Sequence, residues 1–174
     1  MPRYFRRRYA RSIKKKYSFE QTSVQLAVPG YTADNPNVLE GQVSVPIVPP
    51  VTINGMRKVK NITISFGNAP AAATEQYASQ FYYAIVYVPQ GYSPQVLRVP
   101  DTVSDEAATV MYEANQFVMS TGLVELGAGP QRIFTRMSRN LNSGDSVYVI
   151  FKQVTAAQNG YALSALITYA ISYT

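Results

Sequence analysis

Apolar and polar residues alternate with a period of two over much of the chain that follows residue 17. The clearest examples are segments 59–66, 132–137 and 162–173, where Leu166 is the one exception in the last. In the first of these, Lys60, Ile62, Ile64 and Phe66 alternate with Val59, Asn61, Thr63 and Ser65. This period is typical of β-strands that bury one face, so all three segments are predicted to be one-sided strands.

Two other segments, 81–88 and 146–151, are apolar on both faces. A strand with this pattern must be covered on both sides, either by a second sheet or by a neighbouring subunit. Segments 18–28, 41–48 and 109–120 complete a set of about eight predicted strands. We place the connections at 29–40, 49–56, 67–79, 89–108, 121–130, 138–144 and 154–160, with helical turns within Ala69–Tyr77 and Asp105–Met111.

A chain of 174 residues is long enough for one well-cored domain. Eight strands, several of them joined by long connections, favour a sandwich or barrel over a series of tight hairpins. We therefore predict an all-β fold, an eight-stranded jelly-roll sandwich over residues 18–174. A disordered basic N-terminal arm, residues 1–17, precedes it.

The net charge of +6 is unevenly distributed along the chain. Residues after 16 contain eight basic and ten acidic side chains, whereas residues 1–16 contain eight basic and no acidic ones. Such a segment cannot condense into a core and is expected to bind a polyanion. Interleaved aromatic residues suit nucleic acid, although a solubilising tail, a nuclear-import signal or attachment to a membrane surface is also compatible. The predicted nucleic-acid-binding residues of the arm are Arg3, Arg6, Arg7, Arg8, Arg11, Lys14, Lys15 and Lys16.

Basic residues of the body form two further groups. Arg57, Lys58 and Lys60 lie together, while Arg132 and Arg136 are predicted to share one face of a strand, with Arg139 three residues later. Arg57, Lys58, Lys60, Arg132 and Arg136 are candidates to extend the nucleic-acid surface of the arm. An ordinary solvated face or an ion pair between subunits fits them equally well.

The chain has no His and no Cys, which excludes disulfides, zinc sites built on these residues and Ser-His-Asp triads. Asp101, Asp105 and Glu106 form an acidic cluster that we interpret as a solvated loop, and Gly127-Ala-Gly129 as turn geometry. The sequon at Asn61 falls inside a predicted strand and is interpreted as chance. No apolar run reaches the length of a membrane span, and the N-terminus lacks a secretory core. We expect a soluble, unsecreted protein that is not an enzyme and has no cofactor and no metal.

Three motifs appear in order along the chain: Ala84-Ile-Val-Tyr-Val-Pro-Gln-Gly91, Asn115-Gln-Phe-Val-Met-Ser120, and Ser138-Arg-Asn-Leu-Asn-Ser-Gly-Asp-Ser-Val-Tyr-Val-Ile-Phe151. The last is a polar turn that leads into a buried strand. Together with the arginine-rich N-terminus, these motifs resemble capsid proteins of circoviruses and related small circular Rep-encoding single-stranded DNA viruses.

The resemblance implies a jelly-roll coat protein that self-assembles into a small icosahedral shell, T=1 with usually sixty copies, and packages single-stranded DNA. It also implies an arm directed inward or serving host nuclear import, and a location in the virion and in the host nucleus during infection. Three alternatives stay open. They are a non-viral nucleic-acid-binding β-barrel, a coat protein of a small RNA virus and, more remotely, an enzyme with a hydroxyl, lysine or carboxylate site.

Overall fold

The computed structural model of the chain describes residues 17–28, 42–68, 80–94, 117–125, 131–153 and 161–173. All regular secondary structure in these residues is β-strand. The described residues therefore include no helix that is long and apolar enough to cross a membrane. The strands are β1 (Ser18–Val28), β2 (Gln42–Val48), β3 (Arg57–Asn68), β4 (Gln80–Val88), β5 (Phe117–Glu125), β6 (Gln131–Thr135), β7 (Arg139–Leu141), β8 (Ser146–Gln153) and β9 (Tyr161–Tyr173).

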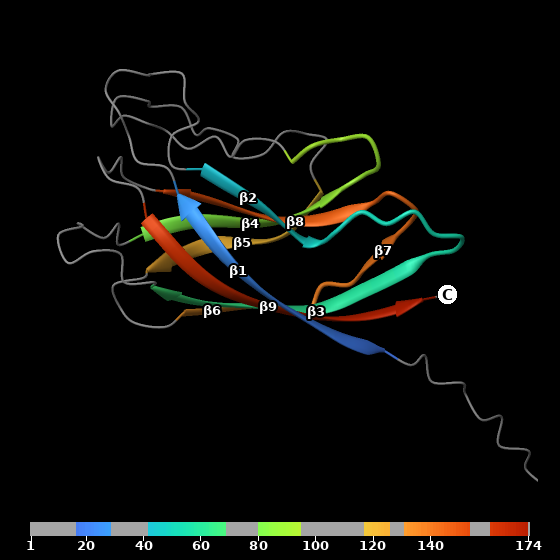
Figure 1. The fold of residues 1–174 in the computed structure, drawn as a ribbon, viewed down its shortest axis with the longest axis horizontal. Helices are drawn as coiled ribbons and strands as arrows, with labels where there is room; N and C mark the ends of the chain where they lie inside the picture. Colours follow the sequence, from blue (N-terminus) through green and yellow to red (C-terminus); the bar gives the residue numbers. More distant parts are fainter. Residues whose placement is uncertain are drawn as a thin grey trace, which may run out of the picture.

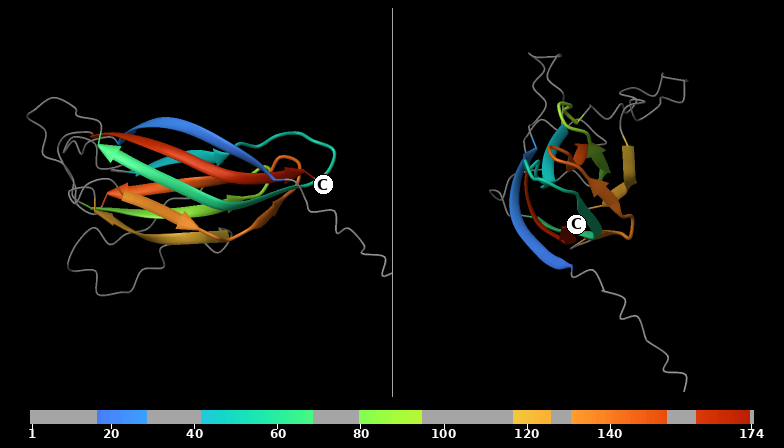
Figure 2. Two further views of the ribbon diagram at one scale, coloured as in Figure 1. Left: turned by 90° about the horizontal axis from the view of Figure 1, so that it is seen from below. Right: turned by 90° about the vertical axis from the view of Figure 1, so that its right-hand side faces the viewer.

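The strands form two antiparallel sheets that pack face to face (Figures 1 and 2). The first sheet has the order β1-β9-β3-β6, with β7 also paired to β3, and the second has the order β2-β8-β4-β5. Strands far apart in the sequence are therefore neighbours in each sheet, and successive strands mostly cross from one sheet to the other. This order is that of a jelly roll, so the predicted fold class is confirmed.

Strand β3 contains an irregularity, and on one of its edges it pairs with two separate strands, β6 and β7, instead of one. Its pairing with β9 shifts between Lys60 and Thr63, and Asn61 there has a φ of 54°. Asparagine is one of the few non-glycine residues that adopt this left-handed conformation readily. On the opposite edge of β3, β7 pairs before the shift and β6 after it. Strands β6 and β7 thus share one of the eight jelly-roll positions.

The main core lies between the two sheets and contains side chains from both. Ile62 and Ile64 of the first sheet and Ile85 and Val149 of the second are completely buried. Phe66 and Phe151 make an edge-to-face contact across the sheets, with ring centroids 5.0 Å apart and an interplanar angle of 86°. Aromatic pairs prefer this geometry, which adds to the apolar area that the core removes from water.

A second, smaller cluster lies on the other side of the second sheet. It contains Ala84, Val86 and Val88 of β4 and Ile150 of β8, each at most 2% exposed. Both faces of these two strands are therefore buried within a single chain, as their two-sided apolar pattern predicts.

The predicted strand boundaries are wrong at several places. The predicted strand 109–120 overlaps β5 only from Phe117, and β5 continues to Glu125 through residues predicted to be a connection. Because β5 is the edge strand of its sheet, it tolerates the polar and glycine residues that suggested a turn. The predicted connection 138–144 contains the short strand β7, and the predicted strand 132–137 ends at Thr135, whose Oγ1 accepts a hydrogen bond from the Met137 amide. The helical turns predicted in 69–77 and 105–111 lie outside the described residues.

Candidate nucleic-acid interface

The outer face of the first sheet carries four basic side chains, Lys58, Lys60, Arg132 and Arg136, and we call this surface the basic face. Directly opposed residues in antiparallel strands share a face, so the register shows which side chains lie together. One row across the sheet contains Phe19, Ala170 and Lys60. The next row contains Gln21, Thr168, Thr63 and Phe134, and a third contains Ser23, Leu166, Ser65 and Arg132.

Strand β6 and the residue that follows it present basic side chains outward, because inward-facing residues alternate with them. Ile133 and Thr135 are 5% and 6% exposed and face the core, whereas Arg132, Phe134 and Arg136 are exposed. The guanidinium carbons of Arg132 and Arg136 each lie 6.0 Å from the centroid of the Phe134 ring. The structure therefore confirms that the two arginines share one side and adds the aromatic ring between them.

Lys58 and Lys60 lie near the start of β3, at the end of the sandwich where the arm meets the body. The Nζ atom of Lys60 lies 3.7 Å from the centroid of the Tyr17 ring, a cation–π contact that holds the last residue of the arm against the basic face. Tyr17 directly precedes β1, and the N-terminal end of β1 pairs with the C-terminal end of β9 at the same end of the molecule (Figure 1). The described part of the chain thus begins at the edge of the basic face.

Carboxylates are missing from the described part of this face. The described residues include three acids, Glu20, Glu125 and Asp145. Glu20 is opposite the core residue Tyr169 and so shares the inner face, Glu125 belongs to the second sheet, and Asp145 is buried. Among the described residues the basic face therefore carries positive charge only, which suits binding to phosphates.

Arg57 departs from the sequence-based prediction. It lies one residue before Lys58, so its side chain points to the opposite side of the sheet, where it is only 2% exposed. Its Nη1 donates a hydrogen bond to the Pro49 carbonyl at 3.0 Å and its Nη2 to the Asp145 carbonyl at 2.7 Å. Arg57 is therefore a structural cation in the interior and cannot contact nucleic acid in this fold.

Beside Arg57, Asp145 joins three segments of the chain. One carboxylate oxygen, Oδ2, accepts hydrogen bonds from the Tyr87 hydroxyl at 2.7 Å and the Asn142 amide at 2.8 Å, and Oδ1 accepts one from the Gln90 amide at 3.1 Å. Burial by itself raises the pKa of Asp145, but these hydrogen bonds and the charge of Arg57 outweigh it and hold the pKa below its ordinary value. Burial, and then the contact with Asp145, raises the pKa of Tyr87.

The predicted turn before β8 positions Asp145. Asp145 donates its amide hydrogen to the Asn142 carbonyl at 3.2 Å, and Gly144 adopts a φ of +80°. A Cβ at this glycine would also lie 2.6 Å from Cγ of Gln90. Both the dihedral angle and the close approach therefore favour glycine here.

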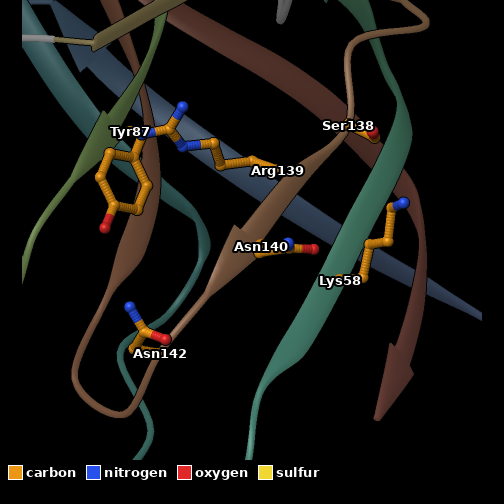
Figure 3. Close-up of a pocket in the computed structure, with 6 residues that line it drawn as sticks. All are labelled: Lys58, Tyr87, Ser138, Arg139, Asn140 and Asn142. Carbon is orange, nitrogen blue, oxygen red and sulfur yellow. The ribbon is translucent and has the colours of Figure 1, made fainter. Parts of the chain in front are cut away.

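A polar pocket of about 360 Å³ lies next to this turn (Figure 3). In Figure 3 the Arg139 side chain extends from β7 toward Tyr87 of the other sheet. The Arg139 guanidinium carbon lies 4.4 Å from the centroid of Tyr87 and 4.9 Å from that of Phe117, so it links the two sheets at their open edge. The residues that line the pocket are Lys58, Tyr87, Ser138, Arg139, Asn140 and Asn142.

Several predicted features lie outside the described residues. They are the charged arm, the acidic cluster at Asp101, Asp105 and Glu106, and the glycine turn at 127–129. No functional role was predicted for Phe134, Tyr87 or Asp145 from the sequence. The same alternation that placed Arg132 and Arg136 on one face also predicts that Phe134, midway between them, shares that face.

No family model matches the chain, and no curated protein matches it. Among solved structures, the chain is similar to the capsid protein of beak and feather disease virus, BFDV, whose crystal structure is decameric. The two chains are 10% identical, with a TM-score of 0.45, and the alignment covers 92% of this chain and 100% of the BFDV chain. The jelly-roll assignment rests on the strand order of this chain itself.

Proposed function

We propose that this chain is a viral coat protein that assembles into a closed icosahedral shell and binds single-stranded DNA through its arm and its basic face. The observation that carries the proposal is the contact between the basic face and Tyr17, the residue that follows the eight basic side chains of the arm in the sequence. Tyr17, at the end of the arm, lies under Lys60 of the basic face. A basic arm attached beside a basic sheet face can provide one surface for a polyanion, and a closed shell places that surface on the same side of every subunit.

The jelly roll and the sequence motifs support the assembly half of the proposal. A jelly roll is a frequent architecture of viral capsid domains. The motif that resembles circovirus capsid proteins, residues 138–151, contains the Arg139 contact, the Asn142–Gly144 turn and Asp145. In the isolated chain, several large apolar side chains are also more than half exposed, as expected of a protein that forms further contacts. They are Phe19, Tyr92, Leu123, Met137 and Tyr173.

Nuclease protection tests which nucleic acid the particles contain. The full chain is expressed, particles are purified, free nucleic acid is removed, and the contents are treated with DNase or RNase after disruption. We expect a single-stranded DNA that resists nuclease in the particle and is destroyed by DNase once released. Protected RNA would replace the proposal with a coat protein of an RNA virus. Binding of nucleic acid without protection would favour the non-viral β-barrel.

A further inference from the structure

Phe134 is an exposed aromatic ring near the end of β6, and in the sequence it lies midway between Arg132 and Arg136. It is 48% exposed on the outer face of the first sheet, and its register partner Thr63 is a small residue that does not cover it. A core role does not account for Phe134, because the neighbours that pack inward from the same strand are Ile133 and Thr135.

The flanking arginines leave the ring accessible. The guanidinium carbons of Arg132 and Arg136 are both 6.0 Å from the ring centroid, which is the outer limit of a cation–π contact. At this distance they flank the ring without closing over it, consistent with its exposure. Within the part of the chain that the structure describes, neither arginine forms an ion pair with a carboxylate.

We propose that Phe134 is a stacking platform for an unpaired nucleobase, with Arg132 and Arg136 holding the phosphates on either side of that nucleotide. Stacking on one ring needs a base whose face is free, so the site selects single strands over duplexes. It tolerates any sequence, because every base has a π face and Phe134 offers no hydrogen bond to read its edge. This inference rests on the proposed function and deepens it by assigning the contact that distinguishes a single strand.

A tryptophan at position 134 provides a direct test, because the chain contains no Trp and Phe134→Trp introduces a single indole. Fluorescence is measured during titration of the full chain with oligodeoxythymidylate and with a duplex of equal length. Stacking of a base on the indole is expected to quench its fluorescence with the single strand and not with the duplex. The matched control is Leu123→Trp, because Leu123 is 51% exposed and lies on β5 of the second sheet, away from the basic face. Equal quenching at both positions, or equal quenching by the duplex, would overturn the proposal.

The affinities of three variants for the oligonucleotide distinguish the contribution of base stacking from those of charge and of apolar area. Phe134→Leu is expected to weaken binding of the oligonucleotide between about fivefold and a hundredfold at every salt concentration, since it removes one stacked base. Phe134→Tyr keeps the ring and is expected to bind like the wild type. Arg132→Gln is expected to make the dependence of log K on log salt shallower by about 0.7. Binding by Phe134→Leu that equals the wild type would contradict the proposal, whereas assembly of that variant into particles tests the coat function separately.

Discussion

The hydroxyl of Tyr87 donates a 2.7 Å hydrogen bond to the carboxylate of Asp145, and this bond ties the end of β4 to the turn that starts β8. Asp145 is 4% exposed, and its backbone carbonyl also accepts a hydrogen bond from the buried Arg57. A single carboxylate thus satisfies a phenol and two backbone amides beside a buried cation. It is the polar centre of one end of the sandwich.

Removal of the Asp145 carboxylate is expected to lower the free energy of unfolding substantially. Asp145→Ala leaves the charge of Arg57 without a nearby carboxylate, and leaves the Tyr87 hydroxyl and two amides without their acceptor. The expected loss in the free energy of unfolding is about 3 to 5 kcal/mol, because three hydrogen-bond donors lose a charged acceptor at about 1 to 3 kcal/mol each. Tyr87→Phe removes one donor to a charged acceptor and is expected to cost about 1.5 kcal/mol. Urea unfolding of both variants measures the difference, and equal losses would contradict the central role of Asp145.

The depressed pKa of Asp145 predicts how this stabilisation depends on pH. A carboxyl whose pKa is lower in the folded state stabilises the fold fully above its unfolded pKa of about 3.9 and loses that contribution as pH falls through the folded value. We therefore expect Asp145→Asn to be less stable than the wild type by a constant amount between pH 5 and 7. The difference should shrink only below about pH 4. Urea unfolding across this range measures it, and a difference that disappeared already near pH 6 would show that another group is responsible.

The burial of β4 gives a prediction about the core. Ile85 is completely buried and lies opposite Val149, so Ile85→Asp places an unpaired carboxylate between two sheets. We expect insoluble or unfolded protein, because the cost of several kcal/mol is comparable to the whole stability of a domain. Leu123→Asp, on β5 at a position 51% exposed, is the matched control and should be soluble. Thermal unfolding followed by circular dichroism measures both, and an Ile85→Asp protein that melts like the wild type would contradict the assigned core.

The charges of the arm predict a strong dependence of binding on salt. Deletion of residues 1–16 removes eight basic side chains. If all eight contact phosphates, the plot of log K against log salt should become shallower by about 5 to 6, at about 0.7 per contact for a single strand. Fluorescence anisotropy of a labelled oligodeoxythymidylate measures the slope, and circular dichroism verifies that the truncated body folds. An unchanged slope would mean that the arm does not bind the nucleic acid.

The fold class was predictable because the pattern of apolar and polar residues indicates which side chains are buried. The buried side chains in turn show which face of each strand is directed toward the core. Segments 81–88 and 146–151 are apolar at every position except Ser146, and both strands are covered on both sides. The pattern fails at Lys60, which alternation groups with Ile62 on one face. In the structure Val59 and Ile62 face the core, and Lys60 faces outward. The irregularity at Asn61 adds one residue, which reverses the assignment on one side of it.

The candidate site was only partly predictable for the same reason. Arg132 and Arg136 lie beside the same ring, as the alternation predicted, although β6 ends at Thr135 between them. Arg57 was not placed correctly, because adjacent basic residues on a strand must point to opposite sides, and a cation at an inward position requires internal partners. Those partners, Pro49 and Asp145, come from segments 8 and 88 residues away, and no local pattern shows that they meet.

The mass of the purified assembly tests the central claim most directly. Sedimentation velocity and negative-stain electron microscopy of the full chain, with and without single-stranded DNA, measure whether closed particles of one size form. Sixty copies of the 19.3 kDa chain correspond to a protein mass of about 1.2 MDa, with each stable contact burying at least about 1,200 Å². We predict uniform closed particles near this mass. A monomer across a wide range of protein and salt concentrations, whether or not DNA is present, would contradict the coat function and favour a nucleic-acid-binding barrel.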